Sequence, residues 1–97
     1  MLLPEIFNSE QPVLVSYGAD WCEPCQWAKP IVEEVIKNFG GKISLYNIDI
    51  DQQPELSREQ HVLSVPTLIL MQKGKELWRM RGFDTAPNLI RILEKFV

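Results

Sequence analysis

The sequence contains little of what several protein classes require. Of its 97 residues, two are cysteine, one is histidine and five are glycine, and the net charge is −3. Two cysteines cannot build a disulfide scaffold with several bridges. A slight excess of acidic residues argues against nucleic acid as a partner, because nucleic-acid binding requires a basic surface. The glycines form neither a phosphate-binding loop nor a dinucleotide fingerprint, so we expect no nucleotide cofactor.

Long apolar runs are missing as well. The run at residues 65–71 is far too short to span a bilayer, so we expect no membrane segment. The N-terminus lacks the basic start and apolar stretch of a secretory signal, which predicts a cytoplasmic protein unless a signal has been removed. The chain is long enough for one domain over residues 1–97, and 45% of its residues are hydrophobic. We expect this domain to be a monomer.

Short apolar segments separated by turn residues predict four strands. Residues 13–19 and 67–71 are nearly continuous apolar runs, typical of strands that are buried on both faces. Residues 43–49 predict another strand. Residues 75–81 alternate apolar and charged side chains, and they follow a tight turn at residues 73–74, which predicts a half-exposed edge strand in a hairpin.

Helices are predicted between these strands. Apolar residues recur at helical spacing over residues 22–39, in a helix that Pro30 should kink. Residues 4–9 and 54–61 predict short helices, and Thr85 can cap a last one. The first two strands, joined by the long helix, should be parallel with a right-handed crossover, and the last two antiparallel. We therefore expect an α/β fold with a four-stranded mixed sheet and helices on both faces.

The two cysteines lie where a buried strand ends and the long helix begins. Free N–H groups and the positive end of the helix dipole favour a thiolate there, so the pKa of Cys22 should fall. Pro24 suits the first turn, where no N–H is needed. Cys25 lies about one turn further on the same side, and we expect it to point inward and to be less exposed. This arrangement predicts thiol–disulfide exchange.

In such an exchange Cys22 attacks a substrate disulfide, and Cys25 then attacks the sulfur of Cys22 and releases the reduced substrate. Two alternatives stay open. Zinc needs about four ligands, and only His61 remains to join the pair, so a zinc site would have to be shared between two chains. The other alternative is a pair of buried, inert cysteines. We expect no metal, and we expect His61 to lie at the surface near a helix end.

Residues 21–25 read Trp-Cys-Glu-Pro-Cys, which resembles the thioredoxin active-site motif Trp-Cys-Gly-Pro-Cys. The likeness runs without gaps from the first predicted strand to the C-terminus. Pro30 is similar to the family's kink proline, and residues 65–67 are similar to its cis-proline loop. Gly74 is similar to the glycine of the family's hairpin turn, and Gly82 to the glycine after its last strand.

The resemblance implies a thioredoxin fold that lacks the family's first strand. It implies Cys22 as nucleophile, Cys25 as resolving cysteine, and a redox-active disulfide between them in place of a cofactor. It also implies a cis peptide bond before Pro66 and a shallow apolar surface that docks substrate. Its residues would be Trp21, Val65, Pro66 and Gly82, with the backbone of Val65 pairing with an extended substrate segment.

Ser16, Glu23 and Pro24 are expected to modulate the site. Ser16 stands where the family has a buried aspartate, and Asn47 where it has a lysine. Because a serine hydroxyl is a poor base, we expect Cys25 to attack slowly near neutral pH. Glu23 replaces the family's glycine, and its charge should oppose a thiolate on Cys22. Pro24 is retained from the motif.

Most of the other notable positions are expected to have structural roles. Gly18 stands where the family often has a second tryptophan, which leaves the identity of the protein partner open. Trp27 and Trp78 are expected to be packing residues. Asp49 and Asp51 follow a strand, and turn or cap roles are expected for them.

The function predicted first is reduction of protein disulfides, with a reductase partner as electron donor. One alternative is a disulfide oxidase or isomerase of an oxidising compartment. Another is a thioredoxin-fold binding module whose cysteines switch its affinity for partners.

Overall fold

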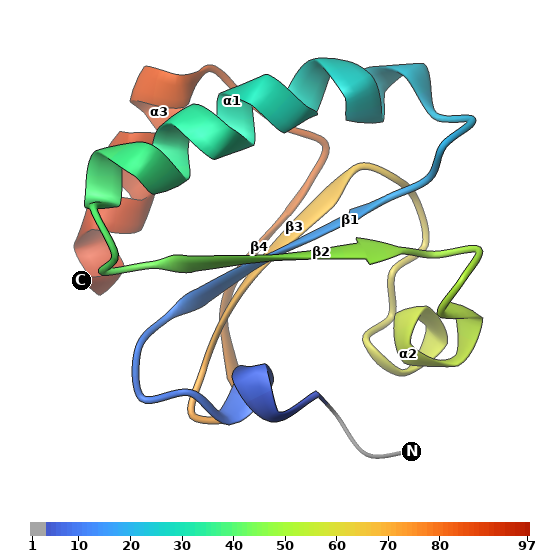
Figure 1. Ribbon diagram of the computed structural model, residues 1–97, viewed down its shortest axis with the longest axis horizontal. Coiled ribbons are helices and arrows are strands. Elements are labelled where there is room, and N and C mark those ends of the chain that lie inside the picture. The colour runs from blue at the N-terminus through green and yellow to red at the C-terminus, as the bar shows by residue number, and fades with distance from the viewer. Residues whose placement is uncertain (1–3) are drawn as a thin grey trace.

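The computed structural model describes residues 4–97, which form one four-stranded sheet with helices on both faces (Figure 1). The strand order is β2-β1-β3-β4; β1 is parallel to β2 and antiparallel to β3, and β4 is antiparallel to β3. No strand precedes β1 within residues 4–97. The expected α/β fold is therefore confirmed. The strands are β1 (Val13–Gly18), β2 (Ser44–Asp49), β3 (Thr67–Gln72) and β4 (Lys75–Arg81).

Two helices lie on one face of the sheet and one on the other. Figure 1 shows α1 and α3 side by side above the strands, and α2 below them with the N-terminal 3₁₀ turn. The long helix α1 runs through Pro30 as one helix and ends at Gly40, whose φ of 56° is left-handed. The bounds are η1 (Glu5–Asn8), α1 (Glu23–Phe39), α2 (Pro54–Glu59), α3 (Ala86–Leu93) and η2 (Glu94–Phe96).

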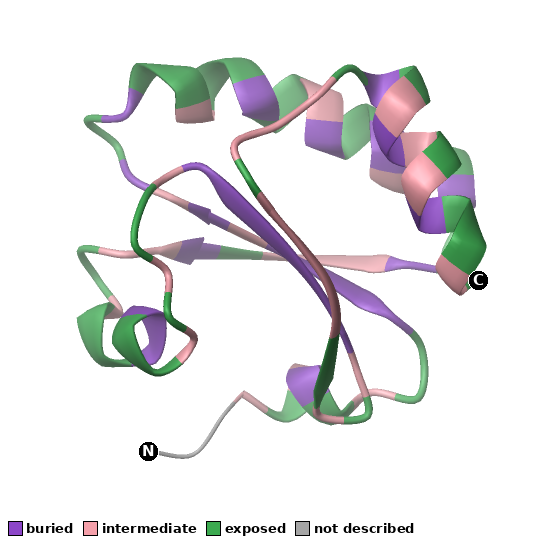
Figure 2. Cartoon of the chain, turned by 180° about the vertical axis from the view of Figure 1, so that it is seen from behind, coloured by how far each residue is buried: buried purple, intermediate pink, exposed green. Residues whose placement is uncertain are grey.

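Alternate residues of the central strands serve two separate cores. Along β1, Leu14 packs under α1 and α3, whereas Val13, Val15 and Tyr17 pack on the opposite face. Such alternation is expected in a strand, because successive side chains point to opposite faces. Figure 2 shows the central strands mostly buried, together with parts of the helices. Helices cover both faces, which explains why the sequence of β1 is almost continuously apolar.

The hairpin between β3 and β4 is also tied to the N-terminal 3₁₀ turn. Lys73 and Gly74 both have positive φ, at 52° and 77°, as the predicted tight turn requires. Their N–H groups donate to the carbonyl oxygens of Ser9 and Phe7, over 3.0 and 2.8 Å. Because residues with side chains rarely adopt a φ of 77°, the turn favours glycine at position 74.

Trp27 is not the packing residue that the helical pattern predicts. Its side chain is 56% exposed, whereas Trp78 is half-buried against the core under α1 and α3. The reason is that α3 lies beside the later turns of α1 and leaves the first turns without a neighbouring helix (Figure 1). Trp27 therefore belongs to the apolar stripe of α1 but lies where no other helix covers the stripe.

Candidate active site

The two cysteines meet at the junction of β1 and α1. Cys22 is the N-cap of α1, and its Sγ accepts a hydrogen bond from the N–H of Cys25 over 3.2 Å. The two sulfurs are joined in a disulfide, with 5.3 Å between the Cα atoms. Pro24, in the first turn, takes a position where the helix needs no N–H. The helix start therefore directs a hydrogen-bond donor at Cys22, as the sequence predicts.

The prediction that Cys25 is the less exposed cysteine is wrong. Cys22 is buried, with 4% of its surface exposed, whereas Cys25 is half-buried. The reason is a pocket of about 350 Å³ that reaches Cys25 from between α1 and the sheet. Gly18 lies against Cys25 in this pocket: a Cβ atom added there would be in ordinary van der Waals contact with Sγ of Cys25, at 3.5 Å.

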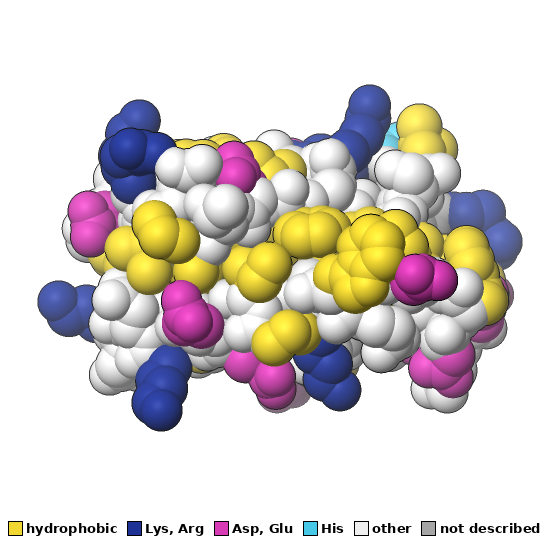
Figure 3. Space-filling model, turned by 90° about the horizontal axis from the view of Figure 1, so that it is seen from above, with side chains coloured by type: hydrophobic (Ala, Val, Ile, Leu, Met, Phe, Trp, Pro, Cys, Tyr) yellow, Lys and Arg dark blue, Asp and Glu magenta, His cyan; other side chains and the backbone are white. Residues whose placement is uncertain are grey.

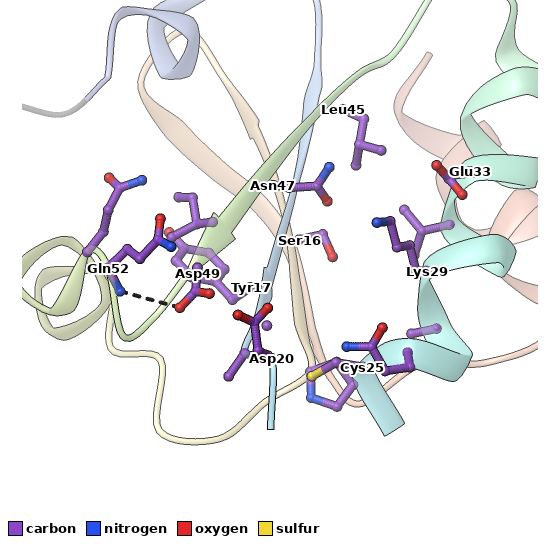
Figure 4. Close-up of a pocket in the computed structure, with 18 residues that line it drawn as sticks. Ser16, Tyr17, Asp20, Cys25, Lys29, Glu33, Leu45, Asn47, Asp49 and Gln52 are labelled. Carbon is purple, nitrogen blue, oxygen red and sulfur yellow. Dashed lines mark hydrogen bonds between the residues drawn. The ribbon is translucent and has the colours of Figure 1, made fainter. Parts of the chain in front are cut away.

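The floor of this pocket contains the two residues that depart from the family's charge pair. Ser16 on β1 and Asn47 on β2 are register partners, and both line the pocket. Figure 4 shows their side chains and that of Lys29, from α1, directed into the same space, with Cys25 at one end. Uncharged side chains thus occupy the strand positions, and an ammonium group approaches from the helix.

Pro66 and Gly82 bring two further loops to the cysteines. The peptide bond between Val65 and Pro66 is cis, as predicted. Pro66 is buried and lines the pocket together with Cys25, and its carbonyl oxygen accepts a hydrogen bond from the N–H of Gly82 over 2.7 Å. Val65 and Gly82 are half-buried. The loop before β3 and the end of β4 are therefore held together beside the disulfide.

Trp21 is exposed beside the disulfide and is held by Asp51. The sequence predicts a turn or cap role for Asp51. The side chain of Trp21 is 69% exposed, and its Nε1 donates a hydrogen bond to Oδ2 of Asp51 over 2.8 Å. The turn role belongs to Asp49, whose Oδ1 accepts from the N–H groups of Asp51 and Gln52. The contact of Trp21 with Asp51 joins residues 30 positions apart, so no local pattern could have indicated it.

The exposed apolar side chains lie near this site and along α1. Figure 3 shows them as a band across the face of the molecule on which α1 lies, with charged side chains on either side of the band. Leu63, in the loop before the cis peptide, is 80% exposed. Exposed apolar area of this kind is typical of surfaces that bind other proteins.

Arg79 holds the loop that leads toward the cis peptide. From β4 it donates to the carbonyl oxygens of Gln60 and His61, over 2.6 and 3.0 Å, and it also pairs with Glu76. The hydrogen bond from Arg79 lowers the pKa of Glu76. His61 is exposed with a left-handed φ of 57°, just beyond the end of α2. It is a surface residue, as predicted.

Tyr17 lies on β1 next to Ser16 and is fully buried. Its hydroxyl has no hydrogen-bond partner among residues 4–97. Burial raises the pKa of this phenol above its usual value, because the ionised form would lose its hydration. The Tyr17 hydroxyl is therefore buried without a hydrogen bond from residues 4–97, which is unusual in a native core and costs stability.

Two absences can be stated for the described part of the chain. Residues 4–97 contain no cluster of three or more histidine, cysteine, aspartate or glutamate side chains that could hold a metal ion. In the same residues no helix has the length and apolar character needed to cross a membrane.

Comparison with known proteins places this geometry in a family. The family model described as Thioredoxin matches residues 4–95. The chain belongs to the thioredoxin family. The predicted resemblance is thereby confirmed, and the Cys22–Cys25 pair makes the protein a thiol–disulfide oxidoreductase.

Individual members of the thioredoxin family show how far the likeness extends. A thioredoxin-like protein of Synechocystis is 39% identical over 90 residues, which are 93% of this chain and 86% of that protein. The bifunctional thioredoxin reductase/thioredoxin of Mycobacterium leprae is 36% identical over 96% of this chain, which spans 20% of that longer protein. Among solved structures, a mutant thioredoxin from Halobacterium salinarum has a TM-score of 0.85 at 28% identity, covering 95% of this chain and 80% of that one.

Proposed function

We propose that the protein reduces disulfide bonds in other proteins and is itself reduced by a separate reductase. The observation that carries this proposal is the hydrogen bond from the N–H of Cys25 to Sγ of Cys22 at the start of α1. In the reduced protein the same N–H and the helix dipole stabilise a thiolate on Cys22. A thiolate is the attacking species in disulfide exchange.

The two cysteines have different roles in this proposal. The thiolate of Cys22 attacks one sulfur of the substrate disulfide, forming a mixed disulfide and releasing the other substrate sulfur as a thiolate. Cys25 loses its proton to solvent in the pocket and attacks Sγ of Cys22, which releases the second substrate sulfur. The substrate gains two electrons, and the protein is left with the Cys22–Cys25 disulfide that the structure contains.

Substrate would dock on the apolar surface beside the disulfide. Trp21 supplies exposed aromatic area, and Val65 supplies backbone groups that can pair with an extended segment. Pro66 and Gly82, joined by their hydrogen bond, fix the shape of the surface between them. The proximity of these four residues to the cysteines supports a role in docking substrate.

The return of the protein to its reduced form needs an electron donor. A separate thioredoxin reductase is the donor we propose, because the Mycobacterium leprae relative combines a thioredoxin reductase and a thioredoxin in its name. We further propose that residues 1–97 act as a single domain, as a monomer, in the cytoplasm. A cytoplasmic location suits a dithiol that must be kept reduced.

Reduction of insulin disulfides with a chemical reductant as electron source tests the proposal. The wild type should accelerate precipitation of the insulin B chain, and Cys22→Ser should not. An inactive wild type would refute the proposal and favour the redox-switched binding module. A strongly oxidising reduction potential, measured against glutathione, would instead indicate a disulfide oxidase.

A further inference from the structure

The segment between α2 and β3 carries the backbone on which a substrate is proposed to pair, yet it is packed only in part. Val62 and Val65 are half-buried against the core on the α2 side, and Leu63 between them is 80% exposed. A loop with few buried contacts opens locally at low cost in free energy. The position of Val65 therefore depends on how the two ends of the segment are anchored.

Strand β4 anchors both ends of this segment. Where the segment ends, the N–H of Gly82 donates to the carbonyl oxygen of Pro66 over 2.7 Å. Where it begins, the guanidinium of Arg79 donates to the carbonyl oxygens of Gln60 and His61, over 2.6 and 3.0 Å. Hydrogen bonds from a charged donor are stronger than those between neutral groups. Arg79 thus supplies a strong anchor at the start of the segment.

The anchored residue His61 has an uncommon backbone conformation. Its φ of 57° is left-handed, which is rare for residues other than glycine and costs free energy. Its N–H donates to the carbonyl oxygen of Arg58 over 3.0 Å, and its own carbonyl oxygen accepts from Arg79. Such a conformation persists where surrounding contacts enforce it. Contacts on both sides of His61 therefore set the direction in which the chain leaves α2.

A bulge in β4 aligns Arg79 for this contact. The pairing with β3 shifts between Glu76 and Trp78, so that Leu77 is an extra residue without a register partner. Without the extra residue, positions 76 and 79 would face opposite sides of the strand. With it, Nε and Nη2 of Arg79 donate to the carboxylate of Glu76 over 3.0 and 2.8 Å. This ion pair orients the guanidinium so that its other N–H groups reach the two carbonyl oxygens.

We propose that Arg79 is a positioning residue for protein substrates: it holds residues 60–66 in the conformation in which the backbone of Val65 can pair with an extended substrate segment. The inference rests on the proposed docking at Val65 and adds to it the side chain that prepares the loop. A loop that is already ordered binds more tightly, because binding does not have to order it. Arg79 does not line the pocket at Cys25, so the exchange reaction itself should not depend on it.

Two disulfides separate this role from a general structural one. Insulin has backbone groups that can pair with Val65, whereas bis(2-hydroxyethyl) disulfide has none. Arg79→Met keeps an apolar stem and removes every donor. We expect it to raise KM for insulin by roughly three- to tenfold with kcat unchanged, and to react with bis(2-hydroxyethyl) disulfide at the wild-type rate. An unchanged KM for insulin, or equal slowing with both disulfides, would overturn the proposal.

Two further variants control for charge and for folding. Arg58→Met removes an exposed guanidinium from the last turn of α2 and should behave as the wild type with both disulfides. A rise of KM equal to that in Arg79→Met would attribute the effect to charge and overturn the proposal. Arg79→Lys keeps the charge but not the planar fork of donors, so its KM for insulin should lie between those of wild type and Arg79→Met. It also serves as the test if Arg79→Met does not fold, and a wild-type KM in Arg79→Lys would overturn the role of the carbonyl contacts.

Hydrogen exchange reports on the start of the segment without any substrate. The N–H groups of residues 60–62 all donate to carbonyl oxygens of α2. We expect these amides to exchange severalfold faster in Arg79→Met and at the wild-type rate in Arg58→Met, while the strand amides stay protected in all three proteins. Equal exchange at residues 60–62 would overturn the proposal. This measurement needs no activity, so it is separate from the proposed function, which a wild type inactive on insulin would refute.

Discussion

Nε1 of Trp21 donates a hydrogen bond to Oδ2 of Asp51 over 2.8 Å, and so fixes an exposed aromatic ring next to Cys22. An unattached tryptophan at this exposure would sample several rotamers, and binding would have to order it. The carboxylate thus prepares the ring for contact with a substrate. Asp51 is a positioning residue in this account, because it acts through Trp21.

Replacing Asp51 should weaken substrate binding more than it slows the chemistry. An exposed hydrogen bond contributes about 1 kcal/mol, so we expect Asp51→Ala to raise KM for a protein disulfide by roughly two- to fivefold, with little change in kcat. Steady-state insulin reduction measures both constants. Asp51→Asn, whose amide oxygen can still accept from Trp21, is the control and should stay near the wild type. Equal KM values in all three proteins would show that the contact does not matter for docking.

Ser16→Asp should speed the release of substrate. Ser16 lines the pocket that reaches Cys25, and a carboxylate there can accept a proton that the hydroxyl cannot. We expect faster resolution of a mixed disulfide near pH 7, measured by stopped flow after single-turnover mixing with a disulfide peptide. Ser16→Asn introduces a side chain of nearly the same shape as aspartate but without its charge, and it should show no gain in rate. If both variants resolve at the wild-type rate, the hydroxyl does not limit the second step.

Glu23→Gln should lower the pKa of the Cys22 thiol in the reduced protein. Glu23 is the first residue of α1 and is exposed, so its charge is partly screened and the shift should be small. The ultraviolet absorbance of the thiolate, followed against pH in wild type and variant, measures it. Added salt should shrink the difference. A pKa that rises on removal of the charge would contradict this account.

Tyr17→Phe should stabilise the protein, and increasingly so at high pH. The buried hydroxyl lacks a partner among the described residues, so removing it should raise the free energy of unfolding by about 1 kcal/mol at pH 7. Above about pH 10 the unfolded chain ionises its tyrosine first, because burial raises the pKa in the folded state, and wild-type stability falls. Urea unfolding at pH 7 and pH 11 should show a gap between the two proteins that widens with pH. A constant gap would mean that Tyr17 does not resist ionisation.

Much of the fold could be read from the sequence because its signals are local. The unbroken apolar run at residues 13–19 predicted a strand buried on both faces, and the helical spacing after Cys22 predicted α1. Both reflect side-chain periods that are set by the backbone geometry itself. The predicted order of parallel and antiparallel strands followed from the lengths of the connections.

What the sequence could not predict depends on distant packing. The helical stripe included Trp27, but the burial of Trp27 depended on which turns of α1 have α3 beside them. The exposure of Cys25 depended on a pocket whose walls come from α1 and two strands. The contact between Trp21 and Asp51 joins two loops that only the folded sheet brings together. None of these has a spacing in the sequence that would indicate it.

The claim on which the account depends is that Cys22 attacks the substrate and Cys25 releases it. Trapping with Cys25→Ser tests this directly, because the variant can form the mixed disulfide but cannot resolve it. After incubation with a disulfide-containing protein such as insulin, mass spectrometry should find the substrate covalently attached at Cys22, and Cys22→Ser should trap far less. Stable adducts on Cys25 in Cys22→Ser, with none on Cys22 in Cys25→Ser, would contradict the assigned order of the two cysteines.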